Sequence, residues 1–242
     1  MKNYRIFVIL VAGMMSCIPA FAQNSSSVGY LTQEDVPNDL IYLPAPPDSS
    51  SQAFLADKAM YEETKALRTG ERGRQAVADV STSTDSILKY FGPAFGMEIT
   101  MDNAPAIYEL IAKAKNDIRL GVNYGKKAYM RKRPFVFFNE STPLPREERS
   151  LRFSGSYPSG HSVRGWGIAL LLVEINPARQ DAILERGYQY GQSRVILGFH
   201  YQSDVDAARL VASAVVARLH ADDEFLAQMK LAKEEFARLS NQ

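Results

Sequence analysis

Two of the three histidines in the chain stand in short segments whose residue types suit the chemistry of an anion. The first segment, Pro158-Ser159-Gly160-His161, runs directly into an apolar stretch, so we expect Pro158 and Ser159 at the start of a helix. Free N–H groups at a helix start bind phosphate, and glycine lets the backbone approach a ligand closely. His161 would stand in the first turn, where its imidazole can give a proton to a departing oxygen. An ordinary capped helix with a surface histidine is the alternative for this segment.

The second segment places a carboxylate four residues after a histidine, as His200 and Asp204. In a helix this spacing puts both side chains on one face. Asp204 could then accept a hydrogen bond from one ring nitrogen of His200, which fixes the tautomer and leaves the other nitrogen as a nucleophile. Arg194 lies six residues before His200, so its guanidinium reaches the same place through a bend of the chain, for example at Gly198, or through the length of the arginine side chain. A purely structural hydrogen bond between the pair is the alternative.

The densest basic cluster spans residues 126–133 and ends at Pro134. Lys126 and Arg133 are seven residues apart, which is two helical turns and therefore one helix face. Pro134 ends the helix and disfavours helical geometry for Arg133, so this guanidinium should emerge where it can bind an anion through two N–H groups. The remaining cations are interpreted as a solvated basic face or a nucleic-acid patch, namely Lys127, Arg131 and Lys132.

Together the three segments supply what phosphoryl transfer requires. It needs cations and N–H donors around the phosphate oxygens, an in-line nucleophile and an acid for the leaving group. The whole chain carries 28 basic and 27 acidic side chains, so no global field favours nucleic acid or an anionic membrane as a partner. We therefore expect a small phosphorylated molecule as the partner.

The N-terminal residues have the pattern of a secretory signal. Lys2 and Arg5 precede an apolar run that is short for a membrane span, and Ala20-Phe21-Ala22 offers a cleavage site. We therefore expect residues 1–22 to be a signal peptide that is cleaved near Ala22. Cleavage would also remove Cys17, the one cysteine, and with it any disulfide, zinc–thiolate site or cysteine nucleophile. Lipidation of Cys17 is the alternative, in a context that fits the lipid-attachment pattern poorly.

The elements that must position these residues are predicted to be helices, so the fold class is all-α, a single-domain helical bundle. Residues 23–52, rich in Ser, Pro and Asp, predict an extended or disordered lead-in, and residues 53–242 form the helical domain. Apolar spacing of three and four residues predicts helices near residues 51–69, 72–80, 84–92, 103–132, 160–175, 178–198, 203–220 and 222–239.

Some segments carry weaker or different signals. Residues 134–138 form a short apolar run that could be extended, and residues 139–149 predict a loop. The runs 166–173 and 210–219 are apolar around most of their circumference, which is typical of central bundle helices. Neither run reaches the roughly 20 apolar residues that a membrane span needs.

With these three segments the chain resembles the bacterial class A non-specific acid phosphatases, in the superfamily of type 2 phosphatidic acid phosphatases and vanadium haloperoxidases. The superfamily pattern is a Lys, six residues and Arg-Pro; then Pro-Ser-Gly-His; then Ser-Arg, five residues, a His, three residues and an Asp. All three parts are intact, beginning at Lys126, Pro158 and Ser193. Flanking sequence such as Gly155-Ser156-Tyr157 is similar as well, so the resemblance covers most of the chain after the signal.

The resemblance implies a role for each matching residue. His200 would attack phosphorus and become a phosphohistidine, Asp204 would orient it, and His161 would protonate the leaving oxygen. The phosphate oxygens would be held by Lys126, Arg133, Ser159, Gly160 and Arg194.

The resemblance also implies properties of the whole protein. It predicts a secreted, periplasmic enzyme with no metal ion or other cofactor, an acidic pH optimum and broad phosphomonoester specificity. Family members are often homo-oligomers, so self-association is a further expectation. A relaxed pocket would also allow phosphate transfer to alcohols other than water.

Two alternative functions use the same residues. A haloperoxidase would hold vanadate in this pocket, bound through His200. A periplasmic anion-binding protein would need the cations but neither the proton donor nor the orienting carboxylate. The third histidine, His220, has no motif around it and is interpreted as a helix-end or surface residue.

Overall fold

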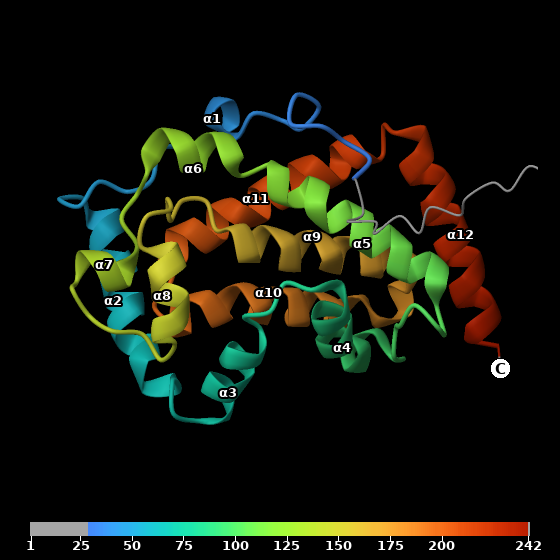
Figure 1. The fold of residues 1–242 in the computed structure, drawn as a ribbon, viewed down its shortest axis with the longest axis horizontal. Helices are drawn as coiled ribbons and strands as arrows, with labels where there is room; N and C mark the ends of the chain where they lie inside the picture. Colours follow the sequence, from blue (N-terminus) through green and yellow to red (C-terminus); the bar gives the residue numbers. More distant parts are fainter. Residues whose placement is uncertain (1–28, 242) are drawn as a thin grey trace, which may run out of the picture.

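The computed structural model of the chain describes residues 29–241, and every regular element in that range is a helix (Figure 1). The predicted all-α, single-domain fold class is therefore confirmed. The predicted signal peptide and its cleavage near Ala22 lie outside the described residues. Among residues 29–241, no helix combines the length and the apolar character needed to cross a membrane.

The helices follow one another with short connections. In chain order they are α1 (Asp39–Tyr42), α2 (Gln52–Thr64), the 3₁₀ helix η1 (Lys65–Leu67), α3 (Glu71–Ala78), α4 (Thr84–Phe95), α5 (Pro105–Leu120), α6 (Asn123–Tyr129), α7 (Pro134–Phe137), α8 (Pro145–Leu151), α9 (Gly160–Ile175), the 3₁₀ helix η2 (Pro177–Arg179), α10 (Gln180–Ile196), α11 (Gln202–Leu219) and α12 (Asp223–Leu239). The helices predicted around residues 51–69, 72–80, 84–92, 160–175, 178–198, 203–220 and 222–239 are confirmed.

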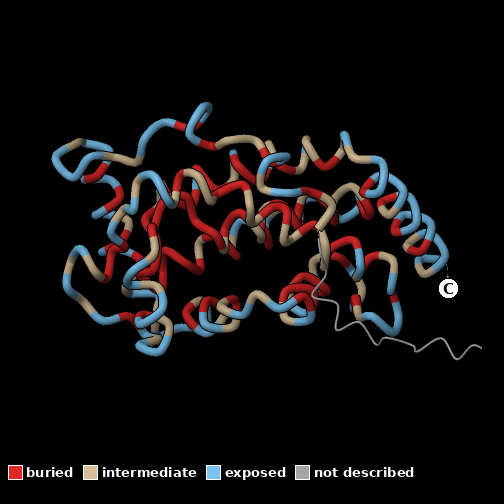
Figure 2. Tube along the Cα trace, turned by 45° about the horizontal axis from the view of Figure 1, so that its top comes forward, coloured by how far each residue is buried: buried red, intermediate tan, exposed pale blue. Residues whose placement is uncertain are grey.

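Helix α9 is the central element of the bundle. It packs against α10, α11 and α5, and its apolar side chains are buried on several sides, as predicted for residues 166–173 (Figure 1). Buried positions run through these central helices, whereas exposed positions lie on the outer loops and the outer side of α12 (Figure 2). The same prediction for residues 210–219 is wrong, because Leu210 is 58% exposed and α11 buries only the side facing the bundle.

The single helix predicted for residues 103–132 is two helices. α5 ends before Gly121, which lies so close to α11 that an added Cβ would meet Val215 Cγ2 at 2.6 Å. α6 then ends at Tyr129, because Met130 adopts a left-handed conformation with φ 41° and its N–H donates to the Lys126 carbonyl. The apolar spacing of residues 103–132 continues without a break, so the sequence alone predicts one helix, but tertiary packing and this cap divide it into two.

Two further predictions between residues 134 and 149 are wrong. Residues 134–137 form helix α7 instead of an extended segment, and part of the predicted loop forms helix α8. In each case a proline, Pro134 or Pro145, occupies the first helical turn, where its fixed φ suits a helix and its missing N–H costs nothing. A four-residue apolar run has no period long enough to separate helix from strand.

The described part of the predicted lead-in, residues 29–52, lies along α5 and α6. Asp117 of α5 accepts hydrogen bonds from the N–H groups of Tyr30 and Leu31, at 2.9 and 3.3 Å. Asp39 accepts one from the N–H of Gly125 in α6, at 2.9 Å. Burial raises the pKa of Asp117 to about 6. These contacts hold the N-terminal segment against the helices that lead to the basic cluster.

The close packing of α9 and α10 gives a stability prediction. Replacing Gly165 with alanine puts the new Cβ 2.4 Å from Cδ1 of Tyr190, which is fully buried. Because this ring cannot move away, we expect Gly165→Ala to lower the free energy of unfolding by about 1–3 kcal/mol, measured by urea denaturation.

The matched control for this variant is Gly70→Ala. At Gly70 the nearest atom to an added Cβ is the Leu67 carbonyl oxygen at 4.0 Å, and the φ of −88° suits alanine. The weaker capping by alanine and its smaller entropy in the unfolded chain oppose each other, so the change should stay within about 0.5 kcal/mol. Equal losses in both variants would contradict the packing argument.

Candidate active site

The three sequence segments meet where α9 begins, at the end of the bundle that α6, α7 and α8 surround (Figure 1). Backbone hydrogen bonds join them directly. The N–H of Ser159 donates to the Asp204 carbonyl at 3.0 Å, and the N–H of Ser156 donates to the Arg131 carbonyl at 2.9 Å. Ser159 is the N-cap of α9, as its position before the apolar stretch predicts, and its Oγ accepts from the N–H of Ser162.

A turn after α10 brings His200 into this junction. α10 ends at Ile196, Gly198 adopts φ 75°, and the N–H groups of Phe199 and His200 both donate to the Arg194 carbonyl. The bend expected at Gly198 is therefore present. The helical pairing expected for His200 and Asp204 is wrong, because His200 precedes α11 and only Asp204 lies in its first turn. The two side chains still meet, with His200 Nδ1 3.3 Å from Asp204 Oδ2.

The contacts of His200 define its tautomer. Nε2 lies 2.9 Å from Nη1 of Arg133, and a guanidinium only donates, so Nε2 accepts and the ring hydrogen is on Nδ1. Nδ1–H points to Oδ2 of Asp204 and to Oγ of Ser156, which is 3.2 Å away. Burial lowers the pKa of His200 well below the ordinary value, and the positive charges of Arg133 and Lys126 lower it further. His200 is thus a neutral imidazole with a lone pair on Nε2.

Lys126 and Arg133 converge on the same region, although they do not share one helix face. Lys126 Nζ donates to the Gly155 carbonyl at 2.8 Å, and Arg133 Nη2 donates to the same oxygen at 3.2 Å. Arg133 is extended, with ψ 155°, as expected for a residue before proline. Burial and the nearby Arg194 lower the pKa of Arg133 to about 9, and burial with Arg133 lowers that of Lys126.

Arg194 is the most unusual cation of the site. It is 1% exposed, and none of its three guanidinium nitrogens has a hydrogen-bond partner among the described residues. Its guanidinium carbon lies 4.5 Å from the centre of the Phe199 ring, and burial lowers its pKa to about 10. Buried charges are normally paired, because removing them from water is costly. The protein itself leaves this charge unbalanced, which an anion would correct.

His161 stands in the first turn of α9, as predicted. Its Nε2 is 2.8 Å from the Val80 carbonyl, an acceptor, so Nε2 carries a hydrogen and Nδ1 is the nitrogen that can gain or lose one. The ring stacks on Tyr190 with a centroid distance of 6.4 Å. Burial lowers the pKa of His161 well below its ordinary value, and the neighbouring Arg194 lowers it further.

Comparisons with known proteins agree with this arrangement. Residues 114–225, which contain every predicted site residue, match the PAP2 superfamily. The chain is 47% identical over 211 residues to a non-specific acid phosphatase of Providencia stuartii, covering 87% of this chain and 85% of that protein. Identity is 40% to a non-specific acid phosphatase of Salmonella typhimurium, over 84% of this chain and 81% of that protein. Identity is 34% to an acid phosphatase of Zymomonas mobilis, over 94% of this chain and 85% of that protein.

The chain belongs to the non-specific acid phosphatases of the PAP2 superfamily. The resemblance noted in the sequence is thereby confirmed at the level of the family.

The acid phosphatase positions Asp204 through a residue that the sequence did not reveal. Arg131 Nη1 donates to Asp204 Oδ1 at 2.6 Å and to Ser203 Oγ at 2.8 Å, while Nη2 donates to Asp57 Oδ2 at 2.8 Å. The guanidinium also lies over the Tyr201 ring, 4.0 Å from its centre. Arg131 therefore links α2 to the first turn of α11.

The interpretation of Arg131 as part of a solvated face is wrong. Its side chain is 9% exposed, whereas Lys127 and Lys132 are exposed, as predicted. No local pattern could have separated the three, because the partner Asp57 lies 74 residues away in the sequence.

His220 lies at the C-cap of α11 and its Nε2 is 2.7 Å from Glu174, outside the site, as predicted for a helix-end residue.

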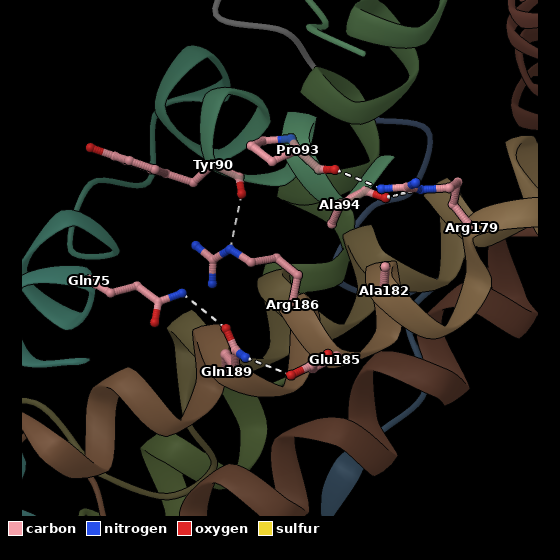
Figure 3. A pocket seen from close by; sticks show the side chains of 9 residues that line it. All are labelled: Gln75, Tyr90, Pro93, Ala94, Arg179, Ala182, Glu185, Arg186 and Gln189. Atoms are coloured by element: carbon pink, nitrogen blue, oxygen red, sulfur yellow. Dashed lines mark hydrogen bonds between the residues drawn. The ribbon is translucent and has the colours of Figure 1, made fainter. Parts of the chain in front are cut away.

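A surface cavity of about 410 Å³ between α4 and α10 is also separate from the site (Figure 3). Its arginines already bind backbone carbonyls: Arg186 Nε donates to Tyr90 and Arg179 Nε to Ala94. Within residues 29–241, no three His, Cys, Asp or Glu side chains gather as a metal-binding group.

The importance of the buried ion pairs of Arg131 can be tested by substitution. Arg131→Met leaves Asp57 and Asp204 as buried carboxylates without their shared cation. Removing one partner of a buried ion pair costs about 3–5 kcal/mol, so we expect a loss of that size in urea unfolding, together with a lower kcat for p-nitrophenyl phosphate.

Lys132→Met is the matched control, because it removes the same charge from the next residue, which is exposed. Its stability should change by less than about 0.5 kcal/mol. An unchanged stability in Arg131→Met, or an equal loss in Lys132→Met, would show that the buried contacts of Arg131 do not matter.

Proposed function

We propose that this acid phosphatase hydrolyses phosphomonoesters through a covalent phosphohistidine at His200 and needs no metal ion. The observation that carries the proposal is the neutral, buried His200, whose Nε2 lone pair lies among Lys126, Arg133 and the unpaired Arg194. A nucleophile and a set of cations in one water-poor site are what phosphoryl transfer requires.

Phosphate binding uses the charges that the protein leaves unbalanced. Arg194 offers N–H donors that have no partner, and the N–H of Gly160 at the start of α9 adds a backbone donor next to Ser159. Arg133 Nη1 exchanges His200 Nε2 for a phosphate oxygen, which frees the lone pair for attack. The dianion then balances the positive charges that lower the pKa values of Lys126 and Arg133.

In the first step the Nε2 lone pair of His200 forms a bond to phosphorus, and the bond from phosphorus to the ester oxygen breaks. The leaving oxygen takes a proton from Nδ1 of His161, because Nε2 of that ring is engaged with the Val80 carbonyl. The imidazole of His200 becomes a cation, which Asp204 stabilises through Nδ1–H. Water then attacks phosphorus, gives its proton to His161 and releases phosphate as the N–P bond breaks.

Further parts of the proposal rest on the sequence and on the relatives. The name "non-specific acid phosphatase" of two relatives supports broad phosphomonoester specificity, with phosphate transfer to other alcohols as a side reaction. Export rests on the signal pattern of residues 1–22, and the periplasm as its destination rests on the family resemblance. Self-association stays a prediction from the family.

The nucleophile is tested by His200→Ala with p-nitrophenyl phosphate as substrate and EDTA in the buffer. Wild type should turn over with EDTA present, and the variant should lose more than about a thousandfold in kcat because the covalent route is closed. Rapid quenching in alkali should trap a phosphorylated protein in wild type and none in the variant.

His220→Ala is the matched control, since it removes a histidine outside the site and should keep near-normal turnover. A folded wild type without turnover would contradict phosphatase function and favour anion or vanadate binding instead. Turnover that EDTA abolishes would contradict metal independence.

The proton donor is tested by leaving-group dependence. We expect His161→Asn to slow hydrolysis of glycerol 2-phosphate by about 10²–10⁴-fold, because an alkoxide must be protonated as it leaves. The loss should be much smaller for p-nitrophenyl phosphate, whose leaving group is stable as an anion. Equal losses for both substrates would assign His161 to binding instead of proton transfer.

The lowered pKa of His161 predicts the pH dependence. A general acid acts only when protonated, so kcat/KM in wild type should fall as pH rises through a value below about 6.5, the ordinary histidine pKa. This alkaline limb should disappear in His161→Asn. An alkaline limb that stays in the variant would belong to another group.

A further inference from the structure

Two more guanidinium groups flank the start of α9, and the mechanism does not use them. Arg164 Nη1 donates to the Gly160 carbonyl at 3.3 Å, one helical turn back. Arg119, in the last turn of α5, also approaches Gly160, since a Cβ added there would lie 3.1 Å from Arg119 Nε. Both side chains are therefore beside the first residue of α9.

Neither arginine has an acidic partner among the described residues. Arg119 Nη1 donates to the neutral amide of Asn123 at 2.5 Å, and Arg164 binds only a backbone carbonyl. Both side chains are half-buried. By contrast, Arg131 and Arg186 each donate to a buried aspartate. Removing a positive charge even partly from water, with no carboxylate beside it, costs free energy, and binding of an anion lowers this cost.

The positive charge of Arg119 also acts on Arg164. Burial lowers the pKa of Arg164 to about 10, and the next cause is the nearby positive charge of Arg119. Burial lowers the pKa of Arg119 as well. Lys115 adds a third cation close to Arg164; its Nζ donates to the Thr82 carbonyl at 3.1 Å, and the charge of Asp85 partly offsets it. Repulsion within such a group is relieved by an anionic ligand.

The positions of Arg119 and Arg164 determine which part of a bound substrate they would contact. Arg164 is close enough to His161 to lower the pKa of that imidazole, and Arg119 acts in the same way on Lys126. The Cβ position at Gly160 is 3.1 Å from Arg119 and 3.5 Å from Cε of Lys126. Arg164 is thus close to the proton donor and Arg119 close to the phosphate-binding Lys126, so the pair borders the region where the proposed mechanism has the leaving group depart.

We propose that Arg119 and Arg164 form a second anion-binding subsite, which receives a carboxylate or a second phosphate carried by the leaving group. The preferred substrates are then phosphomonoesters with two anionic groups, such as phosphorylated hydroxy acids and bisphosphates. The assignment of the leaving-group side rests on the proposed function, but the subsite itself is a binding site that can be tested without turnover.

The binding test compares methylenediphosphonate with methylphosphonate by isothermal titration, since neither has an ester bond to cleave. Wild type should prefer the diphosphonate, and Arg119→Gln and Arg164→Gln should each reduce the ratio of the two affinities about tenfold, the effect of one charge-assisted hydrogen bond. Circular dichroism spectra and urea midpoints show whether each variant is folded. Arg164→Lys, which keeps the charge, should retain part of the preference.

The kinetic test uses a pair of substrates that differ in one group. In 2-phosphoglycerate a carboxylate replaces one hydroxymethyl group of glycerol 2-phosphate. The ratio of kcat/KM for the two substrates should fall about tenfold in Arg119→Gln and Arg164→Gln. Lys127→Gln is the matched control, because it removes one exposed positive charge from α6, and its ratio should stay within about twofold.

The two tests separate the subsite from the proposed function. A diphosphonate preference that depends on both arginines supports the subsite even if wild type hydrolyses neither ester, a result that would defeat only the phosphatase mechanism. Affinity ratios that are the same in wild type and both arginine variants would overturn the subsite. An equal fall in Lys127→Gln would also overturn it, because the preference would then come from the general field of the protein.

Discussion

The buried carboxylate of Asp204 is the group on which the arrangement of the site depends. It is fully buried, and its two oxygens accept hydrogen bonds from Arg131, the Ser156 hydroxyl and the Tyr201 N–H, with His200 beside them. These donors come from the basic cluster, from the residues just before Pro158 and from the segment of His200. A carboxylate in a low-dielectric interior needs such a shell to remain ionised. Asp204 receives these hydrogen bonds only when the segments lie together. The tautomer of His200 follows from the same contacts.

The site nevertheless contains more positive than negative charge. Asp204 is shared with Arg131, so the charges of Lys126, Arg133 and Arg194 have no carboxylate of their own among the described residues. Burial lowers the pKa of each, which measures how unfavourable the charged forms are in the free protein. Binding of a dianion removes this penalty. Stability is thus reduced in exchange for affinity, as is common where a rigid scaffold holds a charged site.

Helix α9 supplies that scaffold. Its side chains from Val163 to Ile175 are largely buried between neighbouring helices, and Gly165 lets α10 approach closely enough to seat Tyr190. The first turn of the same helix carries His161 and the N–H groups that face the site. An element anchored over most of its length cannot shift at its start, so the proton donor is held without help from a flexible loop. Arg164 lies on the same anchored helix.

The sequence by itself determined the features that depend on neighbouring residues. The bounds of α9, the cap at Ser159, the bend at Gly198 and the extended Arg133 all follow from local chemistry, and each is present. The set of candidate site residues followed from motif spacing together with the family resemblance, which mark positions in the sequence but say nothing about distances between them.

Only the tertiary structure decided the rest, because contacts distant in sequence leave no local pattern. Helix α5 ends where Gly121 meets α11, and Arg131 is buried because Asp57 and Asp204 reach it from far along the chain. The unpaired state of Arg194 is likewise a property of the folded chain, since hydrogen-bond partners are counted in space. Local interactions place residues on elements, but burial and charge balance, which set the chemistry, arise only when the elements pack.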